Sequence, residues 1–128
     1  MKIGVLSDAH GNALALKKCL EYLKEKVDKI FFLGDSCGYF PDVNGVIELL
    51  LQYNVHSVSG NHDFMILGKE KIDQKKDLVY QLSKSQKKLN KKTENYLNSL
   101  ATSYTLEYNS LKILMVHASP TNNLHEYV

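Results

Sequence analysis

The sequence predicts an α/β domain built on a parallel sheet, and three observations support this. Short apolar runs alternate with helical patterns over the first sixty residues, and a polar cluster follows each apolar run. Successive clusters lie 27 and 26 residues apart (Asp8 to Asp35, Asp35 to Asn61), about one β-α unit each. A β-α-β-α-β order implies parallel strands with right-handed crossovers. Ligands bind beyond the carboxyl ends of such strands, so we expect the clusters to converge there.

The first half of the chain gives five expected elements. Each strand is a short apolar run, and each helix has apolar residues at helical spacing. Asn12 is expected to cap the first helix, and a turn at Pro41-Asp42 is expected to precede the second. In chain order we expect a strand over 2–6, a helix after Asn12, a strand over 29–33, a helix over 43–53 and a strand over 55–58.

In the second half of the chain, lysine-rich helical patterns replace the alternation of strands and helices. Nine lysines fall between Lys69 and Lys92, and helical patterns cover residues 76–89 and 93–100. A solvated helical face explains these lysines most simply; the alternative is that some of them attract an anionic substrate. Residues 104–108 and 111–116 then predict a β-hairpin with its turn at Asn109-Ser110, and the second strand ends at His117.

Composition limits the class of protein. The chain has 128 residues, 44% of them hydrophobic and 23% charged, which predicts one domain over residues 1–128. Cys19 and Cys37 form no CxxC pair and are expected to be buried free thiols. No secretory signal or membrane-spanning run is visible, so we expect a cytoplasmic protein. The net charge of +2 does not indicate a nucleic-acid or membrane partner, and no arginine is present to clamp a phosphate.

Polar residues at four strand ends carry the expected chemistry. Each cluster alone has a structural explanation, such as a helix cap or a turn. Together they bring carboxylate, amide and imidazole groups toward one edge, a mixture that suits Mn²⁺, Fe or Zn²⁺ better than Ca²⁺. On an extended segment, Asp8 and His10 would face the same way. The candidates are Asp8, His10, Asp35, Asn61, His62, Asp63 and His117.

The motifs DAH, LGD, GNHD and VHASP resemble, in order and spacing, those of the calcineurin-like metallophosphoesterases. LGDSCGYFPDVNGVIELL, SGNHDFMILG and VHASPTNNLHEYV are most similar to the small bacterial and archaeal phosphodiesterases of that superfamily. The resemblance implies a β-sandwich flanked by helices in α-β-β-α layers. It also implies hydrolysis of a small phosphoester, most simply a phosphodiester or nucleotide phosphate.

The resemblance also implies a metal site with two divalent ions. Asp8 and His10 would bind one ion, Asp35 would bridge both, and Asn61 and His117 would bind the second. Manganese is the first expectation, with Fe, Zn²⁺, Ni²⁺ and Mg²⁺ as alternatives. Two ions about 3.5–4 Å apart can clamp a phosphate and activate a water.

His62 and Asp63 have a different implied role. By the same resemblance, His62 would be the general acid at the leaving-group oxygen, and Asp63 would orient it. His56 and His125 lack the context of ligands; His56 is expected to be structural, at the start of a buried strand.

The family's final Gly-His-x-His motif is absent from this sequence. We therefore expect a C-terminally truncated version of the fold, with one protein ligand fewer for each metal. Uncovered apolar surface or a sheet edge would then invite association, which predicts either a piece of a longer protein or a homo-oligomer. The alternative function is a catalytically impaired domain that binds metal weakly or serves as a partner subunit.

Overall fold

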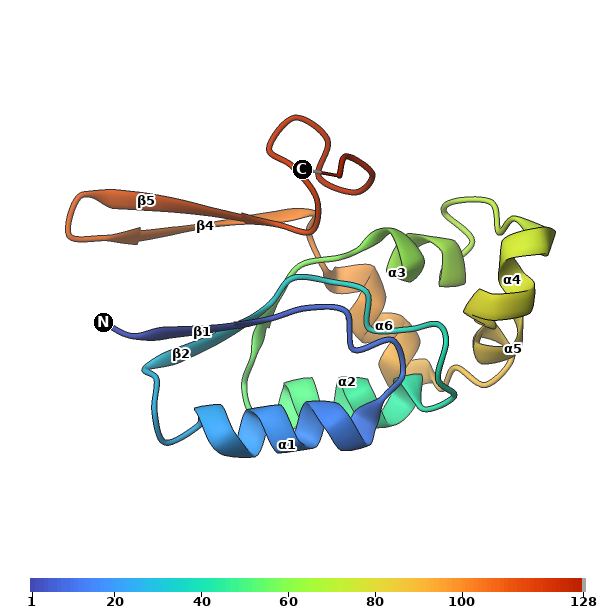
Figure 1. The fold of residues 1–128 in the computed structure, drawn as a ribbon, viewed down its shortest axis with the longest axis horizontal. Coiled ribbons are helices and arrows are strands. Elements are labelled where there is room, and N and C mark those ends of the chain that lie inside the picture. Colours follow the sequence, from blue (N-terminus) through green and yellow to red (C-terminus); the bar gives the residue numbers. More distant parts are fainter. Residues whose placement is uncertain (128) are drawn as a thin grey trace.

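The computed structural model describes residues 1–127 and contains the expected parallel sheet (Figure 1). The sheet has the order β1-β2-β3 and runs parallel throughout. Two crossover helices connect its strands, so the predicted β-α-β-α-β order is confirmed. The elements are β1 (Ile3–Leu6), α1 (Ala13–Leu23), β2 (Lys29–Phe32), α2 (Val43–Gln52) and β3 (His56–Ser57).

Both crossover helices begin at a side-chain cap. Oδ1 of Asn12 accepts a hydrogen bond from Ala15 N at 3.0 Å, and Oδ1 of Asp42 accepts one from Gly45 N at 2.9 Å. Each bond satisfies a backbone donor that the first helical turn leaves free. The caps fix where the loops from β1 and β2 end, and these loops carry several of the candidate residues.

Four further helices lie beyond β3: α3 (Asn61–Ile66), α4 (Gln74–Tyr80), α5 (Leu82–Gln86) and α6 (Lys91–Ser99). The prediction of one helix over 76–89 is wrong, because Gln81 has a left-handed φ of 56°. The Asp77 side chain accepts hydrogen bonds from Leu82 N and Ser83 N and so caps the start of α5. Helix α3 was not predicted, and it begins within the GNHD motif itself.

The predicted hairpin is confirmed as β4 (Ser103–Tyr108) and β5 (Leu111–Val116). Figure 1 shows it lying along the face of the parallel sheet opposite α1 and α2. Leu106 and Met115 pack with Phe31 of β2 in a small apolar cluster. The hairpin thereby positions His117, which follows β5 directly.

The main core lies on the other side of the sheet. Ile30 and Phe32 alternate with Phe31 along β2 and face α1, α2 and α6, where Leu20 and Leu97 are fully buried. The layers are therefore helix, sheet and hairpin. The predicted α/β class is confirmed, but within residues 1–127 no second helical layer covers the outer face of the hairpin.

Two side-chain expectations need correction. Cys37 is buried as expected, but Cys19 is exposed, because it lies on the solvent side of α1 while Leu16 and Leu20 face the core. His56 is exposed rather than buried, and its ring stacks on Phe31 with 5.3 Å between centroids. None of the helices in the described part of the chain has the length and hydropathy needed to cross a membrane.

Candidate metal centre

The loops that follow β1 and β2 run side by side and pair through their backbones. Asp8 N donates to Gly34 O at 3.0 Å, and His10 N donates to Asp35 O at 3.0 Å. Asp8, His10 and Asp35 all have a left-handed φ, between 48° and 58°. Such conformations are uncommon outside glycine and concentrate at functional sites.

The expectation that Asp8 and His10 lie on an extended segment is therefore wrong. Their side chains nevertheless meet, with 3.4 Å between His10 Nε2 and Asp8 Oδ1. The pairing of the two loops, rather than the alternation of a strand, brings them together.

A glycine lets the third loop approach. Gly34 has a φ of +94°, and a Cβ at this position would lie 2.4 Å from the backbone N of Gly60. Any side chain here would push the loop after β3 away from the loop after β2.

Asp63 lies beneath the candidate site and joins these loops. Its Oδ2 accepts hydrogen bonds from Asp35 N and Gly60 N, both at 2.9 Å, and its Oδ1 accepts one from Ser36 N at 3.0 Å. Burial, followed by the nearby charge of Asp35, raises the pKa of Asp63. Among the described residues, its hydrogen bonds go to the backbone and to Ser36 and Cys37, and none reaches the His62 imidazole.

Backbone carbonyls orient two of the histidines. Nδ1 of His10 donates to Cys37 O at 2.9 Å, and Nδ1 of His117 donates to Leu33 O at 2.7 Å. Each bond leaves Nε2 as the atom that faces the cluster. Metal-binding histidines in proteins are oriented in the same way, by a bond from the second ring nitrogen.

The inward-facing atoms form two groups that share Asp35. His10, Asp35 and His62 make one group and Asp8, Asp35 and His117 the other, with the potential ligand atoms of each within 4.8 Å of one another. Asn61 adds a further oxygen, because its Oδ1 lies 3.0 Å from His117 Nε2. Asp35 is 4% exposed, so little water can screen its charge.

This donor set fits a cation. If the imidazoles are neutral, the Nε2 atoms of His10 and His117 and the carboxylate oxygens are all hydrogen-bond acceptors. Their lone pairs then face one another unless a proton or a metal ion lies between them. The Asp35 Oδ2 atom, for example, lies 3.5 Å from His117 Nε2. Mixed nitrogen and oxygen donors suit the ions Mn²⁺, Fe and Zn²⁺.

When no ion is bound, protons lie between the donor atoms of this cluster. Burial lowers the pKa of His117, but its hydrogen bond to Asp35 and the charge of Asp35 outweigh this and raise it to about 9. The hydrogen bond to His10 lowers the pKa of Asp8. Burial lowers the pKa of His10 too, yet Asp8 and Cys37 O raise it by more. The metal-free site thus favours a protonated His117 imidazole near an ionised Asp8 carboxylate.

His62 has different surroundings. It is 5% exposed and packs among aromatic rings, with 4.7 Å to the Tyr80 centroid and 4.9 Å to the His10 centroid. Burial lowers its pKa, which favours the neutral imidazole. Its Nδ1 atom is buried and has no hydrogen-bond partner within the described chain.

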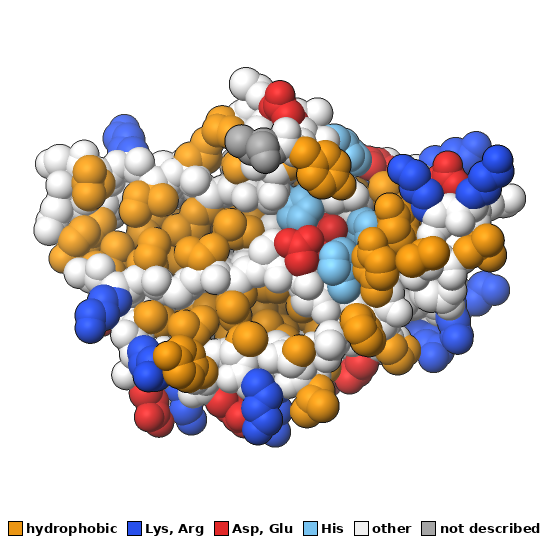
Figure 2. Space-filling model, in the orientation of Figure 1, with side chains coloured by type: hydrophobic (Ala, Val, Ile, Leu, Met, Phe, Trp, Pro, Cys, Tyr) orange, Lys and Arg blue, Asp and Glu red, His pale blue; other side chains and the backbone are white. Residues whose placement is uncertain are grey.

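The cluster opens into a cavity of about 750 Å³. Of the predicted residues, Asp8, His10, Asp35, Asn61, His62 and His117 line it, and Asp63 does not. Figure 2 shows the histidine and aspartate side chains gathered at its centre, with lysines at the far end. The tertiary fold brings further lining residues to this cavity: Tyr39, Lys71, Lys76, Tyr80 and residues 124–127.

Comparisons with known proteins agree with this geometry. Residues 1–128 match the calcineurin-like phosphoesterase superfamily domain. An uncharacterised protein of Methanocaldococcus jannaschii is 34% identical over 98% of this chain and 53% of its own length.

Two crystal structures share the fold. One is a metallophosphoesterase from Sphaerobacter thermophilus, with a TM-score of 0.80 and 30% identity over 100% of this chain and 51% of its own. The other is a hypothetical protein from Pyrococcus horikoshii OT3, with a TM-score of 0.80 and 27% identity over 99% of this chain and 58% of its own. The chain thus spans about half the length of these relatives. On this match, and on the motifs that line its cavity, the chain belongs to the calcineurin-like phosphoesterase superfamily.

Proposed function

We propose that this domain carries out metal-dependent hydrolysis of a small phosphoester, a phosphodiester or nucleotide phosphate, with two divalent ions, Mn²⁺ first. The observation that carries this proposal is the shared carboxylate. Asp35 belongs to both groups of potential ligands, and its buried side chain can hold two cations together against their mutual repulsion. Asp8, His10, Asn61 and His117 would supply the remaining protein ligands.

When bound, the ions would polarise the phosphate and lower the pKa of a water molecule. The residues of the chain would orient the ligand histidines and supply the proton. Cys37 O and Leu33 O keep His10 and His117 in the tautomer that presents Nε2. His62 would give a proton to the leaving oxygen. Its pKa is low in the free protein, and the negative charge of a bound phosphate would raise it.

The test is hydrolysis of bis-p-nitrophenyl phosphate with added Mn²⁺. The His62→Ala variant is expected to lose turnover while it keeps its metal, measured by equilibrium dialysis. The exposed His56 provides the matched control, because His56→Ala removes an imidazole outside the cavity. Retained turnover in His62→Ala would exclude the general-acid role.

A second candidate is a domain that binds metal weakly or serves as a partner subunit. Absence of metal-stimulated hydrolysis at millimolar Mn²⁺, together with measurable metal binding, would support this candidate against the first.

A further inference from the structure

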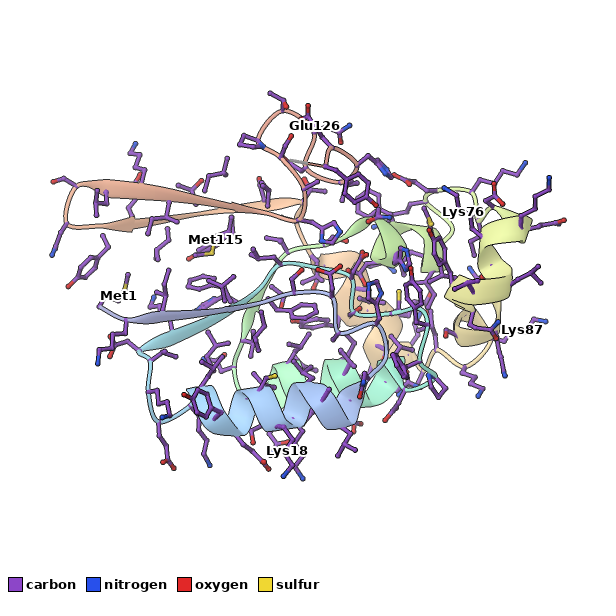
Figure 3. The ribbon with its side chains drawn as sticks, in the orientation of Figure 1. Met1, Lys18, Lys76, Lys87, Met115 and Glu126 are labelled. Carbon is purple, nitrogen blue, oxygen red and sulfur yellow. The ribbon has the colours of Figure 1, made fainter. Side chains whose placement is uncertain are left out.

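We propose that the cavity selects a nucleotide that carries a phosphate besides the one cleaved, with its base against Tyr39 and its second phosphate between Lys71 and Lys76. This inference names the substrate class for the proposed function and rests on it. It draws on cavity-lining residues other than the candidate metal ligands, among them Lys76 (Figure 3).

The cavity is larger than a single phosphate needs. Its volume of about 750 Å³ falls within the range of sites for drug-sized ligands. The candidate ligands occupy only one part of its wall, so the remainder is available for the rest of a substrate.

Tyr39 offers an aromatic face at the mouth. Its side chain is 43% exposed, although its ring meets His10 edge-on at 4.7 Å and lies nearly parallel to His62 at 5.8 Å. The ring thus stands directly beside the candidate metal ligands. Tyr39 N also donates to Tyr80 O at 2.6 Å, which holds this residue in place. A base that stacks on such a ring gains about 1–3 kcal/mol.

Lys71 and Lys76 supply positive charge to the wall of the cavity. Within residues 1–127, neither of them forms an ion pair. The acidic residues that share their wall accept hydrogen bonds from other groups, and Asp73 also interacts with the charges of both lysines. Asp73 accepts hydrogen bonds from Lys75 N and Lys76 N, and Glu126 contacts the hydroxyls of Ser119 and Thr121.

Glu70, which follows Lys69 in the same loop, is likewise paired, with 2.8 Å to His125 Nε2. Among the described residues, the two lysines therefore line the cavity without a direct ion pair, although the charge of Asp73 lies near both. Because the chain has no arginine, lysines are its only permanently charged groups for a second phosphate.

The experiment compares binding of ribose 5-phosphate, AMP and ADP by titration calorimetry in excess Mn²⁺. The unmodified protein is expected to bind AMP more tightly than ribose 5-phosphate and ADP about tenfold more tightly than AMP. The Lys71→Gln/Lys76→Gln variant should lose the preference for ADP, and Tyr39→Leu should lose the preference for AMP over ribose 5-phosphate. Lys75→Gln/Lys87→Gln is the charge-matched control, because neither of its residues lines the cavity.

The outcomes separate this inference from the proposed function. Equal affinities for the three ligands, or an equal loss of the ADP preference in both lysine variants, would overturn the inference even if bis-p-nitrophenyl phosphate is hydrolysed. Conversely, a preference for ADP that depends on Lys71 and Lys76 supports it, whether or not the protein turns over bis-p-nitrophenyl phosphate. Circular dichroism of each variant would verify that it is folded.

Discussion

Asp35 and Asp63 hold each other's loops in place. Asp35 N donates to Asp63 Oδ2 at 2.9 Å, while Asp35 Oδ1 accepts a hydrogen bond from His62 N at 2.9 Å. The loop after β2 and the first turn of α3 are thus joined by reciprocal bonds. The Asp35 carboxylate faces the cavity, and the Asp63 carboxylate lies beneath it. The position of the candidate bridging ligand, Asp35, therefore depends on a residue that does not line the cavity.

Asp63→Asn is expected to destabilise the fold. An asparagine amide would point two donors at backbone N–H groups, leaving buried donors unsatisfied at a cost of about 2–3 kcal/mol. Because the chain has no tryptophan, urea unfolding followed by circular dichroism is a suitable measurement. Asp73→Asn is the matched control, since Asp73 is exposed and asparagine also caps helices well. Equal stability of the two variants would contradict this assignment.

The shared position of Asp35 predicts a difference between two metal-site variants. Asp35→Asn should weaken the binding of both ions by at least about tenfold, because Asp35 belongs to both ligand groups. Asp8→Asn should affect one ion only, since Asp8 belongs to one group. The number of ions retained after dialysis, counted by atomic emission, distinguishes the two. Loss of both ions in Asp8→Asn would show that the groups are not independent.

Gly38→Ala is expected to disturb His62. Gly38 has a φ of +96°, and an added Cβ would lie 2.6 Å from His62 Nδ1. Turnover should fall roughly tenfold to a hundredfold, because displacement of a reacting group by about 1 Å has that effect. Gly68→Ala is the control: its φ of +73° imposes similar backbone strain, yet no atom lies within 4 Å of the added Cβ. A similar loss of turnover in both variants would assign the effect to backbone strain alone.

The stability of the metal-free protein should fall as the pH rises from 6.5 to 9. His117 has a pKa of about 9 in the folded protein against 6.5 as its ordinary value, so folding favours its protonated form. This contribution, up to about 3 kcal/mol, is complete below pH 6.5 and is lost as the pH passes 9. Urea unfolding at several pH values measures it, and His117→Gln should flatten the profile.

Metal binding should show the opposite trend. A proton on His117 Nε2 competes with an ion, so the apparent metal affinity should increase over the same pH range. Calorimetry in buffers of different ionisation enthalpy would measure the protons released. Binding that is independent of pH, with no proton released, would remove His117 from the ligand set.

Much of the architecture could be predicted from periodicity. Apolar runs marked the three parallel strands and the hairpin, and Asn12 and Asp42 marked the starts of two helices. The convergence of the loops that carry Asp8, Asp35 and Asn61 followed from the parallel topology, whereas His117 comes from the antiparallel hairpin. The break at Gln81 could not be predicted, because it depends on a left-handed residue and on the capping of α5 by Asp77.

The sequence predicted which side chains meet at the cavity, apart from Asp63, but not how the loops bring them together. Asp8 and His10 meet through paired loops with left-handed backbones, which no side-chain pattern reveals. The hydrogen bonds of Asp63 depend on three segments that are distant in sequence. Tyr39 and Lys76 reach the cavity through the same tertiary packing, so the sequence alone left lysine recognition as an open alternative.

The apolar surface beside the hairpin predicts self-association. Val5 on the edge strand β1 is 50% exposed and Leu111 on β5 is 65% exposed, and Figure 2 shows hydrophobic side chains gathered between the hairpin and the helices. An open strand edge next to apolar surface favours pairing with a second copy of the chain. The mean mass from light scattering should therefore increase with protein concentration.

The Val5→Thr/Leu111→Ser variant tests whether this surface is responsible. It should lower the concentration dependence of the mass, because both changes reduce the apolar area that association would remove from water. Leu78→Ser is the control, since Leu78 is 78% exposed on α4, away from the hairpin. A monomeric mass for the unmodified protein at every concentration would contradict association. Equal effects of the two sets of changes would place the contact elsewhere.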